Sequence, residues 1–176
     1  MIFHPMELDG VLLVETPIHG DERGTFTRTF CRKSFAAHGL ELPNEQWSVS
    51  GNPLRGTLRG LHYQADPHGE TKLVRCARGA AFHAAVDMRP HSPNLGRHVT
   101  VELRPERPIM LYVPRGFAHG FLTLADDTEI VYGITPEYMA DAARGLLWND
   151  PDIGISWPFP PLIISERDTR LPRLWP

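Results

Sequence analysis

The sequence has 176 residues, of which 41% are hydrophobic and 22% are charged, and its formal net charge at pH 7 is -3. A chain of this length suits one domain with a sizeable core, so we expect residues 1–176 to form a single domain. The charges are of mixed sign without a basic stripe, and no segment approaches about 18 consecutive apolar residues. The composition therefore predicts neither a nucleic-acid partner nor a membrane partner.

The N-terminal segment and the cysteines bear on the cellular compartment. Residues 1–5, MIFHP, lack the basic start and apolar run of a signal peptide. The two cysteines, Cys31 and Cys76, suit a reducing compartment, where each serves as a small packing residue. We therefore expect a cytoplasmic protein.

Taken in chain order, the hydrophobic residues form short runs that clusters of Gly, Pro, Asp and Asn interrupt. Short apolar runs separated by such residues are typical of all-β proteins. About ten short strands at this spacing predict a sandwich or barrel, and a jelly roll is the first expectation. The expected strands are Gly10–Glu15, Thr25–Phe30, Gln46–Ser50, Thr57–Tyr63, Lys72–Cys76, Ala80–Met88, His98–Leu103, Pro108–Val113, Gly120–Leu124 and Glu129–Ile134.

One segment, Lys33–Leu40, has the pattern of a short helix, with Ser34 available as an N-cap and Gly39 near its end. After Pro136 the chain contains many prolines, which exclude central strands, and we expect this tail to wrap the barrel. The predicted fold class is therefore an all-β jelly-roll barrel with one short helix and a loop-rich C-terminal tail.

The strand Ala80–Met88 carries polar residues on one face. Strand alternation places His83 and Asp87 on the same face as Ala81 and Ala85. Unpaired polar groups in a sealed core cost about 1–3 kcal/mol each, so a barrel with a ligand cavity is favoured over a barrel with a solid core.

The run Arg59–Gln64 holds the residues best suited to chemistry. Strict alternation would place Arg59 and His62 on opposite faces, but Gly60 between them permits a β-bulge that turns both side chains inward. Taken alone, Arg59 fits a solvated surface residue and His62 a buried core histidine.

A second cluster, Pro114–Phe121, contains a tight turn followed by His119 at the mouth of the expected barrel. A Pro-x-Gly-x-x-His run of this form often supplies a metal ligand in cupins, so a metal-dependent cupin is one alternative. Such a site ordinarily also has a His-x-His pair, and here Gln64 stands at the second position after His62. We therefore expect no metal site. Phosphate-cradling glycine loops are absent as well, which leaves Arg23, Arg59 and Lys72 as candidates for binding anionic oxygens.

Taken together, the motifs resemble the dTDP-4-dehydrorhamnose 3,5-epimerase family, in the family's order and over nearly the whole chain. This resemblance implies a cupin jelly roll that is a homodimer, uses no metal or cofactor and binds a nucleotide diphosphate sugar. The matching stretches are Gly20–Phe26, Gly56–Gln64, Lys72–Cys76, Ala85–Arg89, Pro114–Phe121, Gly145–Pro151 and Ser165–Asp168.

The resemblance also implies a role for each candidate residue. A ketone at C4 of the sugar acidifies the protons on C3 and C5, so inversion needs a base, an acid and a cation for the enolate. By resemblance these are His62, Tyr132 and Lys72, with Asp168 orienting His62. In relatives the N-terminal strands cross to the partner subunit, which would place Arg23, Phe26 and Arg28 in the neighbouring site. The substrate-binding residues implied are Arg23, Phe26, Arg28, Gln46, Ser48, Arg59, His83, His119, Tyr138 and Arg167.

The departures from the family pattern are informative. The family usually has Glu at Arg28, Asn at Ser48, Asp at His83 and Glu at Ala143. The Glu at position 28 is associated with the thymine base, and Arg can only donate hydrogen bonds, so we hypothesise an altered nucleotide preference, such as CDP or GDP. If His83 faces the cavity near Lys72, its imidazole replaces the family's usual carboxylate and leaves Lys72 without a pairing charge. A single-site 3- or 5-epimerase and a non-catalytic sugar-nucleotide binding protein therefore stay open as alternatives.

Overall fold

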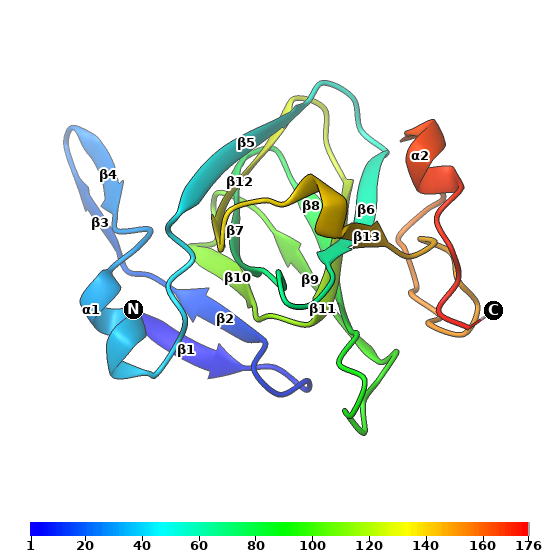
Figure 1. The fold of residues 1–176 in the computed structure, drawn as a ribbon. Coiled ribbons are helices and arrows are strands. Elements are labelled where there is room, and N and C mark those ends of the chain that lie inside the picture. Colours follow the sequence, from blue (N-terminus) through cyan, green and yellow to red (C-terminus); the bar gives the residue numbers. More distant parts are fainter. Residues whose placement is uncertain (176) are drawn as a thin grey trace.

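The computed structural model describes residues 1–175, and most of its strands form two sheets that face each other (Figure 1). The first sheet has the strand order β1 (Ile2–Pro5), β2 (Leu12–Glu15), β10 (Ile109–Val113), β7 (Thr71–Arg78), β12 (Thr128–Thr135) and β5 (Gln46–Asn52). The second has the order β13 (Ala143–Gly145), β6 (Thr57–Gln64), β11 (Phe117–Thr123), β8 (Ala81–Asp87) and β9 (His98–Leu103), and β14 (Ile163–Ile164) pairs with β6.

Strands that follow one another in the chain lie in opposite sheets over much of the barrel. From β6 to β7, and again from β10 to β11 and β11 to β12, the chain crosses from one sheet to the other. Antiparallel pairing with such crossings is the jelly-roll arrangement. The predicted all-β, cupin-type jelly roll is therefore confirmed.

Two parts of the chain lie outside the barrel. The hairpin of β3 (Ile18–Asp21) and β4 (Gly24–Thr27) forms its own two-stranded sheet and projects to one side (Figure 1). The C-terminal segment with helix α2 (Glu166–Thr169) lies on the other side of the barrel, beside β6. Within residues 1–175 no helix is long and apolar enough to cross a membrane.

The observed elements differ from the predicted ones mainly in short segments. Strands β1, β3, β13 and β14, helix α2 and the 3₁₀ turn Ala140–Ala142 were not predicted, because runs of two to four residues carry little periodicity. The predicted helix forms as α1 (Arg32–Ala37), but its N-cap is Cys31 without a side-chain hydrogen bond, so Ser34 as the cap was wrong. Cys31 and Cys76 are both free, and Cys76 is buried in the core.

The expectation of a wettable face on β8 was also wrong. Ala81 and Ala85 belong to the main core cluster, and His83 and Asp87 are both 0% exposed. Strand β8 lies between β11 and β9 and is covered by the opposite sheet, so its polar side chains are enclosed within the protein. The Asp87 carboxylate, for example, accepts hydrogen bonds from Arg89 and Ser92.

Candidate active site

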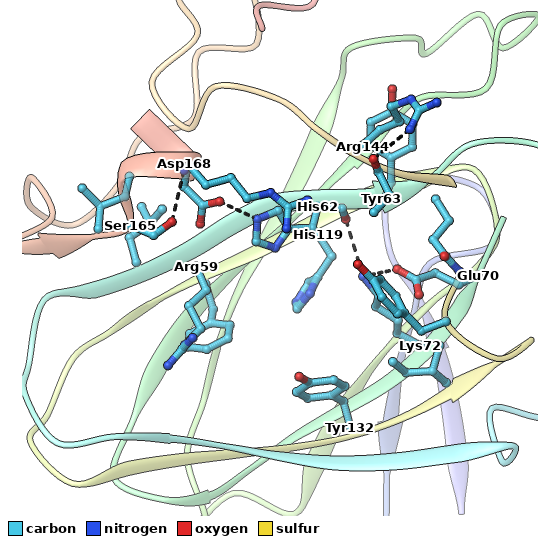
Figure 2. A pocket seen from close by; sticks show the side chains of 18 of the residues that line it. Arg59, His62, Tyr63, Glu70, Lys72, His119, Tyr132, Arg144, Ser165 and Asp168 are labelled. Carbon is cyan, nitrogen blue, oxygen red and sulfur yellow. Dashed lines mark hydrogen bonds and ion pairs between the residues drawn. The ribbon is translucent and has the colours of Figure 1, made fainter. Parts of the chain in front are cut away.

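A cavity of about 580 Å³ lies between the two sheets at the end that β6, β7, β11 and β12 form. Figure 2 shows that side chains from both sheets and from the C-terminal segment point into it. The site residues predicted from the sequence that line it are Arg59, His62, Lys72, His119, Tyr132, Tyr138, Arg167 and Asp168.

A β-bulge at Gly60 brings Arg59 and His62 to the same cavity, as the sequence predicted. In the pairing of β6 with β11, His62 is opposite His119 and Arg59 is opposite Phe121, so the register shifts by one residue between them. Gly60 has a φ of +129°, and a Cβ atom there would lie 2.5 Å from the Cα of Gly120. Only glycine meets both conditions, because an added side chain would collide with backbone.

His62 is held by a carboxylate from the other end of the chain. Its Nε2 lies 2.7 Å from Oδ1 of Asp168. The backbone N–H of Gly60 donates to the second oxygen of Asp168 at 3.2 Å, and Ser165 caps α2 by accepting from the Asp168 N–H at 3.1 Å. Because a carboxylate only accepts, Nε2 of His62 carries the hydrogen and Nδ1 is the basic nitrogen of the neutral ring.

The carboxylate of Asp168 is charged despite its burial. Its side chain is 5% exposed, and this burial by itself would raise its pKa. The hydrogen bond and charge of His62 and the hydrogen bond from Gly60 outweigh the burial and hold the pKa of Asp168 below its usual value. A charged Asp168 stabilises the protonated form of His62, which is what a base requires after it has accepted a proton.

Tyr132 and Lys72 lie on the wall opposite His62 (Figure 2). Tyr132 belongs to β12 and Lys72 to β7, both in the first sheet, whereas His62 belongs to the second sheet. Lys72 is paired with Ile134 across these strands, so Tyr132, two residues from Ile134, shares the cavity face with Lys72. The cavity therefore has an imidazole on one wall and a phenol on the other, and the Lys72 side chain extends from the phenol's wall until its Nζ lies 3.5 Å from the carbonyl oxygen of His62.

Lys72 forms an ion pair that the sequence did not predict. Its Nζ lies 2.7 Å from Oε1 of Glu70, and the two side chains are 10% and 7% exposed. Glu70 also lines the cavity, just before β7 begins. The spacing of two residues along an extended chain was the signal that could have identified this carboxylate as a neighbour of Lys72.

His83 does not face the cavity, which corrects its expected place among the substrate-contacting residues. It is 0% exposed, and its Nδ1 lies 3.1 Å from Nε2 of His119, which does line the cavity. Burial lowers the pKa of His83 to about 3, and burial together with the nearby ammonium group of Lys72 lowers the pKa of His119 well below its usual value. The two rings are therefore neutral, and Nε2 of His83 has no hydrogen-bond partner among the described residues.

Several polar contacts order the rest of the cavity. Arg59 donates from Nε to Oδ1 of the buried Asn52 at 2.9 Å, which sequence reasoning had not connected to the site. Gln64 accepts from the N–H of Met139 at 2.7 Å and so holds the chain that covers the cavity. Among residues 1–175, no three His, Cys, Asp or Glu side chains are grouped so that they could hold a metal ion.

Other predicted site residues are not part of the cavity lining. Arg23 is paired with Asp21 on the β3–β4 hairpin, and Phe26 on the same hairpin is 68% exposed. Gln46 and Ser48 belong to β5, where the Gln46 side chain accepts from the N–H of Tyr138 at 2.7 Å. The predicted residues outside the cavity lining are Arg23, Phe26, Arg28, Gln46, Ser48 and His83.

Comparisons with known proteins agree with this geometry. The family model described as dTDP-4-dehydrorhamnose 3,5-epimerase matches residues 5–175. A dTDP-4-dehydrorhamnose 3,5-epimerase of Sinorhizobium fredii is 45% identical over 179 aligned residues, covering 99% of this chain and 90% of the relative. A dTDP-4-dehydro-6-deoxyglucose 3-epimerase of Streptomyces bikiniensis is 37% identical over 97% of this chain and 88% of the relative.

Among solved structures, a dTDP-6-deoxy-D-glucose-3,5-epimerase of Legionella pneumophila in complex with dTDP-4-keto-L-rhamnose superposes with a TM-score of 0.93. That structure is 32% identical, and the match covers 98% of this chain and 92% of the other. With its fold, cavity and sequence in agreement, the chain belongs to the dTDP-4-dehydrorhamnose 3,5-epimerase family of isomerases.

Proposed function

We propose that this protein inverts C3, C5 or both in a nucleotide-linked 4-keto-6-deoxyhexose, in deoxysugar biosynthesis. One observation carries the proposal: a carboxylate-supported imidazole, His62, faces a phenol and an ammonium group across one cavity. Inversion at carbon requires removal of a proton from one face and delivery of a proton to the other, and this arrangement supplies a donor and an acceptor on opposite walls.

In the proposed reaction, Nδ1 of His62 takes the proton from a carbon next to the ketone. The electron pair of that C–H bond moves to the ketone oxygen and forms an enolate, which the ammonium group of Lys72 stabilises. Tyr132 then delivers its hydroxyl proton to the opposite face of the same carbon. Exchange of protons with solvent returns His62 and Tyr132 to their starting states.

The diphosphate of the substrate would bind near Arg59 and Arg167, whose guanidinium groups match anionic oxygens. The hydrogen bond from Arg59 to Asn52 supports this role because it holds the guanidinium at the cavity before a ligand arrives. Relatives named for dTDP-linked sugars support a nucleotide diphosphate as the part of the ligand that these arginines bind.

We also propose that the functional form is a homodimer in the cytoplasm, in which the β3–β4 hairpin of one subunit contributes Arg23, Phe26 and Arg28 to the neighbouring site. The hairpin projects from the barrel, and its Phe26 is 68% exposed, which favours burial against another surface. The free state of both cysteines fits a reducing compartment. Sedimentation of the purified protein tests the dimer, and a monomer at micromolar concentration would contradict it.

The function is tested by isotope exchange. The protein is incubated in deuterated water with 4-keto-6-deoxyglucose linked to dTDP, CDP or GDP, and deuterium is located by NMR. We expect incorporation at C3, C5 or both, and loss of incorporation in the His62→Ala variant. A folded protein that exchanges no proton with any of the three sugars would contradict the proposal.

A further inference from the structure

The ion pair between Glu70 and Lys72 is unusual in its position. Its atoms are 2.7 Å apart, both side chains are at least nine-tenths buried, and both line the ligand cavity. Exposed ion pairs contribute little to stability, and buried ones are often no better than apolar residues of the same size. A contribution to stability therefore does not by itself explain why this ion pair lies at the cavity, and we consider a function for it.

The strand places the carboxylate where it contacts Lys72. Glu70 directly precedes β7 and Lys72 is the second residue of that strand, and their side chains meet in the ion pair while Thr71 between them donates a hydrogen bond to Glu41. An ammonium group has three hydrogens to donate. Glu70 accepts one at 2.7 Å, and the carbonyl oxygen of His62 lies 3.5 Å from Nζ, which leaves one hydrogen for a ligand oxygen.

Glu70 is also the one carboxylate that contacts Lys72 within residues 1–175. The other groups around the ammonium do not supply a negative charge. His119 is neutral and hydrogen-bonded to His83, and the carboxylate of Asp168 is hydrogen-bonded to His62 and has no ion pair with Lys72 among the described residues. The remaining titratable or charged side chains that line the cavity are Arg59, Tyr63, Tyr132, Tyr138, Arg144 and Arg167.

We infer that Glu70 is a positioning residue that keeps Lys72 protonated and directs its free N–H toward the ketone oxygen of the substrate. The family usually has Asp at position 83, and the presence of His83 there suggested that Lys72 lacks a pairing charge. Glu70 supplies that charge. The inference rests on the proposed function only for the identity of the oxygen that Lys72 contacts. A buried ammonium without a neighbouring carboxylate releases its proton more readily, so removal of the Glu70 charge should leave Lys72 partly neutral.

The test compares Glu70→Gln, which removes the charge and keeps the shape, with Glu15→Gln as the matched control. Glu15 is a half-exposed carboxylate paired with His4, away from the cavity. The neutral amine is the form that reacts with acylating reagents, so the rate of Lys72 modification at constant pH, measured by peptide mass spectrometry, reports its charge without any substrate. We expect that rate to rise at least about 10-fold in Glu70→Gln and to stay unchanged in Glu15→Gln.

Kinetics provide the second measurement. We expect Glu70→Gln to lower kcat at least about 10-fold with little change in KM, and to move the alkaline limb of the pH profile to lower pH by about one unit. Glu70→Asp, which keeps the charge, should recover part of both effects and serves if the Gln variant does not fold. The inference would be overturned if Glu70→Gln had the same rate of Lys72 labelling and the same alkaline limb as the parent protein. If the parent protein turned over none of the sugars, that result would count only against the proposed function.

Discussion

Nε2 of His62 lies 2.7 Å from Oδ1 of Asp168, although 106 positions separate the two residues in the chain. Strand β6 carries the imidazole, and helix α2, capped by Ser165, carries the carboxylate. The contact forms because the C-terminal segment returns to β6, where β14 pairs with its first residues. This one contact gives the partly exposed imidazole of His62 a defined tautomer, with the hydrogen on Nε2.

Asp168→Asn should leave the barrel folded and lower kcat by about 10²- to 10⁴-fold, because an amide can no longer stabilise protonated His62 or select its tautomer. Turnover of the preferred nucleotide sugar measures the effect. Asp152→Asn is the control, since Asp152 is exposed and lies outside the cavity lining. An Asp168→Asn variant with parental turnover would show that His62 does not act through this pair.

Tyr132→Phe should separate proton removal from proton delivery. His62 can still take a proton from the sugar, so deuterium exchange should continue, while formation of the inverted product should fall about 10²-fold. NMR of the sugar measures both quantities in one sample. Tyr112→Phe is the matched control, because the Tyr112 hydroxyl contacts the carbonyl of Glu41 and does not line the cavity. Equal losses of exchange and inversion would contradict the assignment of Tyr132 as the acid.

Gly60→Ala should destabilise the protein by roughly 2–3 kcal/mol, because its φ of +129° disfavours a side chain and the new Cβ would meet the backbone of Gly120 at 2.5 Å. Chemical denaturation measures this change. Gly51→Ala on β5 is the control, since a Cβ there meets nothing within 4 Å, and it should change stability by less than about 0.5 kcal/mol. Similar stabilities for the two variants would mean that the bulge tolerates a side chain.

His83 should make the folded protein sensitive to acid. Burial lowers its pKa from 6.5 to about 3, so between these values the unfolded chain binds a proton that the folded protein does not. The free energy of unfolding should therefore fall as pH decreases through this window, by up to about 1.4 kcal/mol per pH unit for His83. Urea unfolding between pH 4.5 and 6.5 should show a shallower slope for His83→Gln than for the exposed control His91→Gln. Parallel slopes would contradict a neutral, buried His83.

Arg28 should shift the nucleotide preference. Arg28 is exposed beside the β3–β4 hairpin, so in the proposed dimer it can reach a base in the neighbouring cavity. Because Arg only donates hydrogen bonds, we expect kcat/KM to be higher for the CDP or GDP sugar than for the dTDP sugar, and Arg28→Glu to reverse that order. Equal or better turnover of the dTDP sugar by the parent protein would contradict this prediction.

Much of the barrel could be predicted from the sequence because its signals are local. Short apolar runs bounded by Gly and Pro predicted the longer strands, and Gly60 predicted the bulge that joins Arg59 and His62 in one cavity. The shortest elements, β13, β14 and α2, could not be predicted because they form only where they pack against β6. Local propensity contributes little in runs of two to four residues.

What the sequence by itself determined was the fold class, the family pattern and the bulge at Gly60 that brings Arg59 and His62 to one cavity. These features depend on local signals, namely short apolar runs, ordered motifs and a glycine within a strand. Only the tertiary structure decided which groups touch. In the folded protein Glu70 forms an ion pair with Lys72, and Asp168 is hydrogen-bonded to His62. His83 is hydrogen-bonded to His119 and does not line the cavity. Such contacts depend on how sheets face each other and where a distant segment docks, and no local pattern in the chain encodes either.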